Sequence, residues 1–164
     1  RYSVRDANMS NHTNWIVVGS PENFAATRAH GFTVQGLKSR HRKKAETMRP
    51  GDRIVWYITG VKAFAGYATV TSEYFEDHTL IWKSKDPKRD AEDYPWRVRI
   101  EPVIALDDAD FLPAEPIARQ MAHVAKWPEA NWTLAFQGNV HKIGDEDFEI
   151  IRLALEHAAA VVAH

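Results

Sequence analysis

Short runs of β-forming residues separated by turns most constrain the fold of this chain. Residues 14–19 are apolar enough for a buried strand, and residues 53–59 and 64–71 are rich in β-branched and aromatic side chains. A Pro-Gly-Asp turn at 50–52 precedes the second run, and a short loop separates it from the third. We therefore expect the second and third runs to pair as antiparallel strands.

Two further strands are expected later in the chain. Residues 79–82 form a short apolar run, and residues 96–101 alternate strictly between apolar and charged side chains. The charged stretch between them, residues 83–92, is typical of a solvated loop.

Helical signals surround these strands. Ser20 is a suitable N-cap for a helix with Pro21 in its first position, residues 38–48 form a basic helical segment, and apolar side chains recur at helical spacing in residues 145–158. No repeated strand–helix–strand pattern is present. The sequence therefore predicts an α+β fold, a strongly curved and mostly antiparallel β-barrel of five to six strands surrounded by short helices.

Composition removes several classes of function. The formal net charge is -1 and the pI is about 6.8, so no global positive field attracts nucleic acid or a membrane, and any such contact must be local. The chain has no cysteine, and its 8 histidines lack the spacing of metal ligands, which predicts no disulfide, no metal and no cofactor.

Length and the N-terminal residues predict the organisation of the chain. The 164 residues suit one domain, which we expect at residues 14–160 after a flexible leader at residues 1–13. The leader is polar, and no apolar run is long enough to span a bilayer. We expect a cytoplasmic, monomeric protein with no membrane partner.

A series of short motifs follows one order along the chain. They are Asn14-Trp15, Ser20 with Glu22-Asn23, Gly31-Phe32, Met48 to Asp52, Val55-Trp56-Tyr57, Phe64-Ala65-Gly66, Tyr94 to Val98 and Phe136-Gln137-Gly138. This series, which extends from Asn14 to about Leu155, resembles the EVE domain family. The resemblance implies a PUA-like barrel, related to YTH and ASCH domains, with a pocket at the barrel mouth for a modified base turned out of its strand.

The resemblance and the residue types together predict the members of this pocket. A site for a base needs aromatic faces for stacking and a few groups that hydrogen-bond to the edge of the base. The predicted pocket residues are Ser20, Pro21, Asn23, Phe32, Tyr57, Phe64, Trp82, Tyr94, Pro95, Arg97 and Trp127.

Ordinary structural roles explain several of these residues equally well. Ser20 also fits a plain N-cap, and Tyr57 also fits a core tyrosine. Arg97 either points into the barrel mouth, where it donates hydrogen bonds, or lies on the solvent face as a surface charge. Trp82 and Trp127 are predicted to wall the pocket because they lie in or beside loops.

One dense positive cluster stands out in an otherwise balanced chain. Lys38, Arg40, Arg42, Lys43 and Lys44 are predicted to contact a phosphate backbone, which would make binding weaken with salt. A solvated helix face explains the same cluster.

These features predict a non-catalytic module that binds DNA or RNA through a modified base, either methylated or hydroxymethylated cytosine or methylated adenine. Two alternatives within nucleic-acid biology are an enzyme that acts on modified nucleotides, with Asp52 or Glu73 as a base, and an RNA-binding module of the tRNA or rRNA modification type. A third is a protein-interaction domain with an exposed aromatic patch. No nucleophile–base pair or cofactor loop supports the enzyme, so no catalytic residue is predicted.

Overall fold

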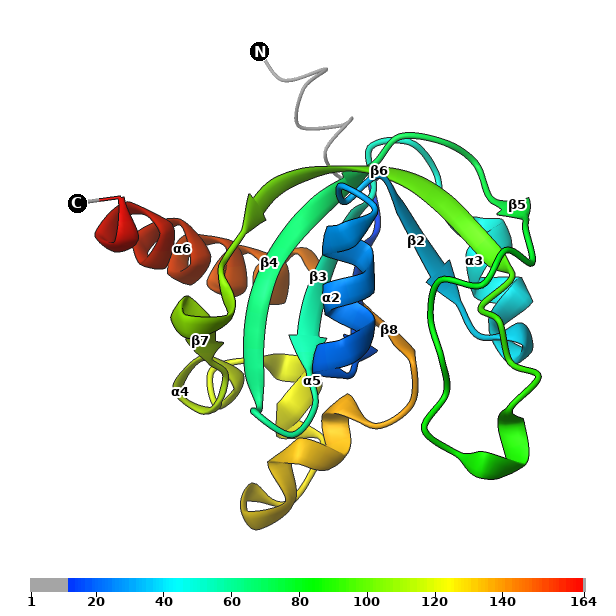
Figure 1. Ribbon diagram of the computed structural model, residues 1–164. Helices are drawn as coiled ribbons and strands as arrows, with labels where there is room; N and C mark the ends of the chain where they lie inside the picture. Colours follow the sequence, from blue (N-terminus) through cyan, green and yellow to red (C-terminus); the bar gives the residue numbers. More distant parts are fainter. Residues whose placement is uncertain (1–11, 164) are drawn as a thin grey trace.

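A single curved sheet of eight strands forms the centre of the molecule in the computed structural model, which describes residues 12–163 (Figure 1). The main path of the sheet runs β2-β6-β4-β3-β1-β8, while β5 and β7 add short pairs to β6 and β4. Strands β1 and β3 are parallel, and the other neighbours are antiparallel. This half-barrel with short helices confirms the expected α+β, strongly curved and mostly antiparallel fold.

The strands are β1 (Asn14–Gly19), β2 (Val34–Leu37), β3 (Arg53–Ile58), β4 (Ala63–Val70), β5 (Phe75–Glu76), β6 (Trp96–Ala105), β7 (Leu112–Pro113) and β8 (Val140–Ile143). The α-helices are α2 (Pro21–Ala29), α3 (Arg42–Thr47), α4 (Glu115–Ala118), α5 (Ala122–Ala125) and α6 (Asp145–Val162). The 3-10 segments are η1 (Ser39–His41), η2 (Pro87–Arg89), η3 (Asp108–Asp110) and η4 (Glu129–Phe136).

Two hydrophobic cores lie on opposite faces of the sheet. The concave face buries Trp15 and Trp56 of the sheet together with Phe24 of α2, which lies against β3 (Figure 1). The other face buries Phe64 of β4 against side chains from α4, α5, η4 and α6, among them Phe148 of α6. Because successive strand residues point to opposite faces, these two cores use alternate residues of the same strands.

Strong local curvature requires a glycine in β4. Gly66 has a φ of 145°, and a Cβ at this position would collide with the carbonyl group of Ile104 on β6. The pairing of β4 with both neighbours also shifts register near this point, as it does at a β-bulge. The missing side chain thus lets two strands approach closely where the sheet bends.

The main expected elements are present. Residues 53–59 and 64–71 largely form the antiparallel pair β3 and β4, and Ser20 caps α2 by accepting a hydrogen bond from the backbone N–H of Asn23 at 3.1 Å. The apolar face expected in residues 145–158 is the buried face of α6. None of the helices in residues 12–163 is both long and apolar enough to cross a bilayer.

Two expectations about strands were wrong. Residues 79–82 are not a strand, because Thr79 and Leu80 are exposed and only Trp82 turns inward as part of a long loop. The strands β2, β5, β7 and β8 were not expected, since each has only two to four residues. The leader expected at residues 1–13 falls almost entirely outside the described residues, and the limits of the domain stay a prediction.

Candidate functional site

A depression lies at the carboxyl ends of the parallel strands β1 and β3, where α2 begins. It has a small inner cavity of about 20 Å³ and a wider outer pocket of about 180 Å³. The two compartments share the lining residues Val18, Gly19, Asn23, Tyr94 and Asn139. The inner cavity has room for one or two water molecules, whereas the outer pocket is several times larger.

The inner cavity is lined mainly by apolar side chains. Val17, Phe24, Trp56, Ile58 and Trp82 form most of its wall. Besides the polar residues that it shares with the outer pocket, Thr27 on α2 and Gln35 on β2 line the cavity, and both are buried. Both are already engaged: Gln35 accepts a hydrogen bond from the indole N–H of Trp56 at 2.9 Å, and Thr27 accepts one from that of Trp82 at 2.9 Å. An apolar group of one or two heavy atoms suits this space.

The outer pocket is basic. Lys38, Lys83 and Lys85 line it, and none of the described lining residues is acidic. Lys85 is paired with Glu22 at 3.2 Å, and the Lys38 ammonium lies 5.9 Å from the centre of the Tyr94 ring. Burial, followed by the charge of Arg40, lowers the pKa of Lys38. The outer pocket therefore favours a negatively charged or electron-rich ligand.

Asn23 ties the start of α2 to the long loop at residues 77–95. Its side-chain N–H donates to the Lys83 carbonyl at 2.9 Å, and its side-chain oxygen accepts from the Lys83 backbone N–H at 3.0 Å. The same amide N–H lies 3.3 Å from the Tyr94 hydroxyl. One helical side chain therefore holds two points of the loop over the pocket.

Trp82 is the deepest part of this loop. Its ring is 2% exposed and packs beside Tyr94, with the ring centres 6.0 Å apart. Gly36 on β2 makes room for it, because a Cβ there would lie 2.5 Å from the ring and 2.7 Å from the Tyr94 carbonyl oxygen. The loop thus closes onto β2 only because Gly36 has no side chain.

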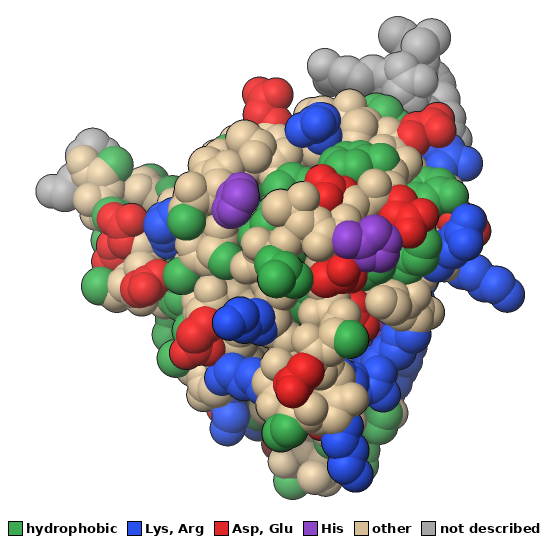
Figure 2. Space-filling model, turned by 45° about the vertical axis from the view of Figure 1, so that its right-hand side comes forward, with side chains coloured by type: hydrophobic (Ala, Val, Ile, Leu, Met, Phe, Trp, Pro, Cys, Tyr) green, Lys and Arg blue, Asp and Glu red, His purple; other side chains and the backbone are tan. Residues whose placement is uncertain are grey.

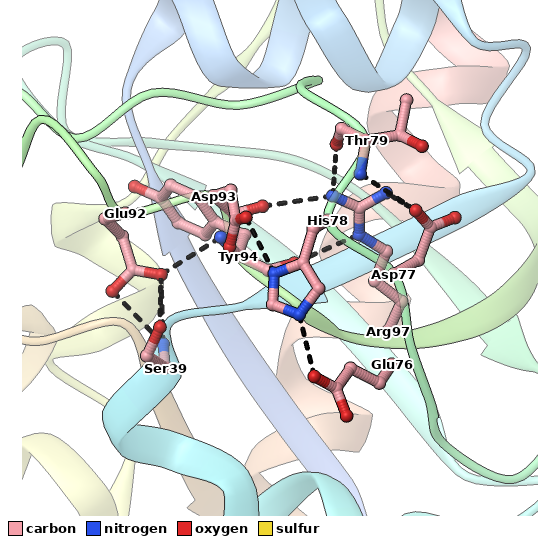
Figure 3. Close-up of polar contacts among 9 residues, drawn as sticks. All are labelled: Ser39, Glu76, Asp77, His78, Thr79, Glu92, Asp93, Tyr94 and Arg97. Carbon is pink, nitrogen blue, oxygen red and sulfur yellow. Dashed lines mark hydrogen bonds and ion pairs between the residues drawn. The ribbon is translucent and has the colours of Figure 1, made fainter.

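Arg97 on β6 fixes the loop from below (Figure 3). Its guanidinium donates hydrogen bonds to the carbonyl oxygens of Tyr94 at 3.0 Å, Asp93 at 3.0 Å and Thr79. It also pairs with Asp77 at 3.4 Å and lies 5.1 Å from the centre of the Trp82 ring. Arg97 is 1% exposed, so neither alternative, a donor in an open mouth or a surface charge, describes it. It is a structural clamp.

Two exposed contacts reinforce this clamp at the surface (Figure 3). The His78 ring bridges Asp93 at 2.8 Å and Glu76 at 2.7 Å, and these two hydrogen bonds raise the pKa of His78. The Glu92 carboxylate accepts hydrogen bonds from Ser39 on one side and from the Tyr94 backbone N–H on the other. Both ends of the loop are therefore fastened.

Asn139 closes the gap between the two ends of the half-barrel. Its side-chain oxygen accepts from the Lys38 backbone N–H at 2.8 Å, next to the end of β2. Its backbone carbonyl accepts from the Val18 N–H on β1 at 2.8 Å. A single residue therefore joins strands that do not pair directly, and it forms part of the pocket wall.

The structure brings five of the predicted pocket residues together. Ser20, Asn23, Trp82 and Tyr94 line the inner cavity, the outer pocket or both. Tyr57 also borders the inner cavity, but its ring is stacked on Phe136 at 4.2 Å on the other face of the sheet, and burial raises its pKa to about 12. Tyr57 therefore matches the core alternative more closely.

Five other predicted pocket residues lie outside these compartments. Pro21 is exposed in the first turn of α2, and Pro95 is buried at the end of the loop, directly before β6. Phe32 packs against Phe24 and Trp56 in the concave core, and Phe64 is fully buried in the opposite core. Trp127, at 42% exposure, lines a separate depression beside Trp132. Core packing and the spread of these residues over both faces explain why the pocket excludes them.

The predicted positive cluster divides in the structure. Among its members, Lys38 alone lines the outer pocket. Arg42 pairs with Glu46 at 3.2 Å, Lys44 donates to the Val140 carbonyl at 3.0 Å, and the side chains of Arg40 and Lys43 are exposed. Figure 2 shows acidic and basic side chains mixed over one face, with Lys and Arg gathered along its lower right edge.

Sequence reasoning missed several residues that line the pocket. Lys83 and Lys85 fell within the charged stretch assigned to a solvated loop, although they border the outer pocket. Gln35 is a single polar residue within the short strand β2, Asn139 directly precedes the short strand β8, and both are buried. Their place in or beside an apolar run was the one signal in the sequence, because a polar side chain buried there needs a hydrogen-bond partner.

Asp52, proposed as a base in the enzyme alternative, has a structural role. It is 1% exposed, and its carboxylate accepts hydrogen bonds from the backbone N–H groups of Thr13 at 2.9 Å and Arg49 at 3.1 Å. The indole N–H of Trp15 also points to it at 3.4 Å. A carboxylate committed to three donors is poorly placed to accept a proton from a substrate.

Comparison with known proteins identifies relatives that match most of the chain. A model of the EVE domain matches residues 13–153. UPF0310 protein PH1033 of Pyrococcus horikoshii is 27% identical over 154 residues, covering 87% of this chain and 99% of that protein. UPF0310 protein PYRAB08750 of Pyrococcus abyssi is 27% identical over 149 residues, covering 86% and 98%.

Solved structures share the fold at low sequence identity. The Mmi1 YTH domain has a TM-score of 0.63 and 14% identity, covering 92% of this chain and 79% of that chain. A complex of the Mmi1 YTH domain with RNA has a TM-score of 0.59 and 15% identity, covering 98% and 92%. Human THYN1 protein, in complex with 5-methylcytosine containing DNA, has a TM-score of 0.57 and 18% identity, covering 88% and 98%.

Proposed function

Because the chain belongs to the EVE domain family, we propose that it is a nucleic-acid-binding module that takes one modified base, turned out of its strand, into the depression at the ends of β1 and β3. The base ring occupies the outer pocket, and its small modifying group enters the inner cavity. The modified base is a methylated or hydroxymethylated cytosine or a methylated adenine. The proposal assigns no chemical step to the protein.

The observation that carries this proposal is the two-compartment shape of the depression. The outer pocket, of about 180 Å³, is basic and bordered by the Tyr94 ring, while the inner cavity, of about 20 Å³, is mainly apolar. A base offers a flat ring for stacking and polar edges, and a methyl substituent adds one small apolar group. The two compartments match these two parts in size and polarity.

The complexes of the structural neighbours support the nucleic-acid partner. Human THYN1 protein was solved with 5-methylcytosine containing DNA, and the Mmi1 YTH domain was solved with RNA. At this low sequence identity, the two structures are evidence for a shared fold only. They do not identify the base or the sugar that this protein binds, so the test includes both DNA and RNA.

The small inner cavity predicts modest selectivity. Burying one CH₂ group is worth about 0.8 kcal/mol, and one methylene in an apolar pocket changes specificity by about 1–3 kcal/mol. We therefore expect a modified base to bind about 5- to 150-fold more tightly than its plain counterpart. Groups much larger than hydroxymethyl should be rejected, because apolar side chains surround the cavity.

The test is a titration of short single- and double-stranded DNA and RNA that differ in one base. Plain, methylated and hydroxymethylated cytosine and plain and N6-methylated adenine are compared at two salt concentrations by fluorescence anisotropy. Preference for one modified base, with affinity that falls as salt rises, is the expected result. Equal affinity for plain and modified strands would contradict the proposal.

A plug variant links that preference to the depression. Gly19 lines both compartments, a Cβ there would meet nothing within 4 Å, and its φ is not positive. Gly19→Leu should therefore fold normally yet place a side chain in the mouth and abolish the preference. Gly144→Leu is the matched control, because Gly144 is equally open but lies at the start of α6. If both variants behave alike, the base binds elsewhere.

A further inference from the structure

A second, larger depression lies beside the outer pocket. It has a volume of about 560 Å³, and its walls come from the end of β1, the turn between β3 and β4, and the end of η4. Val18, Thr59 and Gly138 line both this groove and the outer pocket. The two are therefore adjoining parts of one continuous surface.

The charge of this surface differs from that of the chain as a whole. The sequence holds 21 basic and 22 acidic residues. Lys62 lines the groove, three lysines line the outer pocket, and none of the described residues lining either depression is acidic. Such an arrangement favours a polyanion that crosses from the outer pocket into the groove.

The backbone of the groove presents open, fixed positions. Gly60 and Gly138 have φ angles of 82° and 84°, and a Cβ at Gly60 would meet nothing within 4 Å. Lys62 has a φ of 53°, and its carbonyl accepts a hydrogen bond from the Ala114 N–H at 3.0 Å, which pins the turn. A ligand can therefore approach the backbone closely here without displacing side chains.

Gln137 supplies a free hydrogen-bonding group at the edge of the groove. Its side chain is exposed and makes no hydrogen bond to any residue in the range 12–163. An amide side chain offers both donor and acceptor atoms to the edge of a base.

We infer that the groove binds the nucleotide next to the modified base, with Lys62 contacting the connecting phosphate and Gln137 facing the neighbouring base. This inference rests on the proposed function and deepens it. The strand then runs from Lys83 and Lys85 across the pocket to Lys62. The outer face of α3, where Lys43 lies, stands apart from this path.

The first test compares ligands of increasing length. Wild-type protein is titrated with the modified nucleoside, with the two dinucleotides that carry a neighbour on the 5′ or the 3′ side, and with the trinucleotide, each as DNA and RNA. We expect one dinucleotide to bind at least tenfold more tightly than the nucleoside, and the backbone amide signals of Gly60 and Lys62 to shift with that dinucleotide and not with the nucleoside. If no neighbour adds affinity, the groove is not a nucleotide site.

Charge reversal supplies the matched comparison. Lys62→Glu should weaken trinucleotide binding about tenfold or more and lower the salt slope by about one, while leaving nucleoside binding unchanged. Lys43→Glu, an equal change at an exposed lysine that lines none of these depressions, should alter affinity less than twofold. Equal effects of the two reversals would overturn the inference.

A sequence preference gives the third readout. Gln137→Ala should reduce discrimination among neighbouring bases while the preference for the modified base persists.

If wild-type protein binds plain and modified trinucleotides equally but Lys62→Glu weakens the binding of both, the inference about the groove stands and the modified-base proposal fails. If the modified base is preferred but Lys62→Glu and Lys43→Glu have the same effect on affinity, the inference about the groove is wrong while the proposed function stands. Absence of any oligonucleotide binding would overturn both.

Discussion

Two aromatic clusters flank the mouth end of the sheet, and they are held together in different ways. The dry cluster, Tyr57, Phe64 and Phe136, packs ring on ring in the core beneath η4 and α6. The anchored cluster, Trp82 and Tyr94, belongs to the 77–95 loop, and each of its rings makes a hydrogen bond to a side chain of α2. The aromatic composition of the sequence alone does not distinguish these two kinds of cluster.

The difference shows which aromatic groups suit a binding role. Rings that polar contacts fasten at the edge of a cavity keep a defined position beside the space that a ligand would enter. Rings in a packed core contribute mainly dispersion and hydrophobic burial, although Tyr57 and Phe136 also border the groove beside the outer pocket. We therefore expect substitutions in the dry cluster to act on stability and substitutions around the anchored cluster to act on binding.

The largest expected effect on stability is in the dry cluster. Phe64→Ala removes a fully buried ring and leaves a cavity, which should lower the free energy of unfolding by about 3–5 kcal/mol. Urea denaturation measures this change. Oligonucleotide affinity per folded molecule should stay within twofold of wild type, and a large loss of affinity would show that the two clusters are not separate in function.

The next effect is at the clamp beneath the anchored cluster. Arg97→Met keeps the aliphatic stem but removes the donors to three loop carbonyls, so the free energy of unfolding should fall by about 1.5–3 kcal/mol. Affinity for the modified base should fall at least tenfold because Trp82 and Tyr94 lose their fixed position. Arg99→Met, at the exposed neighbour on β6, is the control and should change neither quantity appreciably. Unchanged affinity in Arg97→Met would show that the loop keeps its position without the hydrogen bonds from Arg97.

A smaller effect is expected where the loop meets β2. Gly36→Ala places a methyl group 2.5 Å from the Trp82 ring, so the loop must shift, at a cost of about 1–3 kcal/mol. Amide hydrogen exchange in residues 77–95 should accelerate while exchange in β3 and β4 stays slow. Gly144→Ala adds the same methyl group in open space and should leave exchange unchanged. Unchanged loop exchange in Gly36→Ala would mean that Trp82 adapts without opening the loop.

The smallest effect concerns the exposed histidine of the loop. Hydrogen bonds to Glu76 and Asp93 raise the pKa of His78 above its ordinary value of 6.5. A pKa raised by folding stabilises the folded loop fully below pH 6.5, and that contribution is lost as the pH rises through the folded-state pKa. NMR titration of the His78 ring should show the raised midpoint, and Glu76→Gln should lower it. A midpoint at or below 6.5 would show that the bridge does not persist in solution.

Local signals in the sequence predicted much of the framework. Ser20 caps its helix as its residue type and position indicate, and β3 and β4 pair across the short loop between them. The apolar spacing in residues 145–158 correctly predicts the buried face of α6, because a helix has 3.6 residues per turn and such spacing places the apolar side chains on one side. These features depend on near neighbours in the chain.

Which residues form the site could not be predicted from local sequence patterns, because it depends on contacts between segments that are distant in the sequence. Arg97 alternates with apolar residues like a surface charge, yet the loop folds over it and buries it. Phe64 and Trp82 are both large aromatic residues, but Phe64 points from β4 into the opposite core, whereas Trp82 reaches the cavity because its loop folds onto β2 at Gly36. Asn139 joins two strand ends that are distant in sequence, which a periodic pattern cannot reveal.

The bond across the gap in the half-barrel also bears on how the protein matures. Asn139 meets Lys38 across this gap over a separation of 101 residues, and the wall of the outer pocket includes both. Contacts between such distant segments carry a large loop-closure entropy and form slowly. The pocket therefore forms only after synthesis has passed Asn139 and the segments have folded together, so a chain that ends before Asn139 has no completed wall with which to engage a ligand.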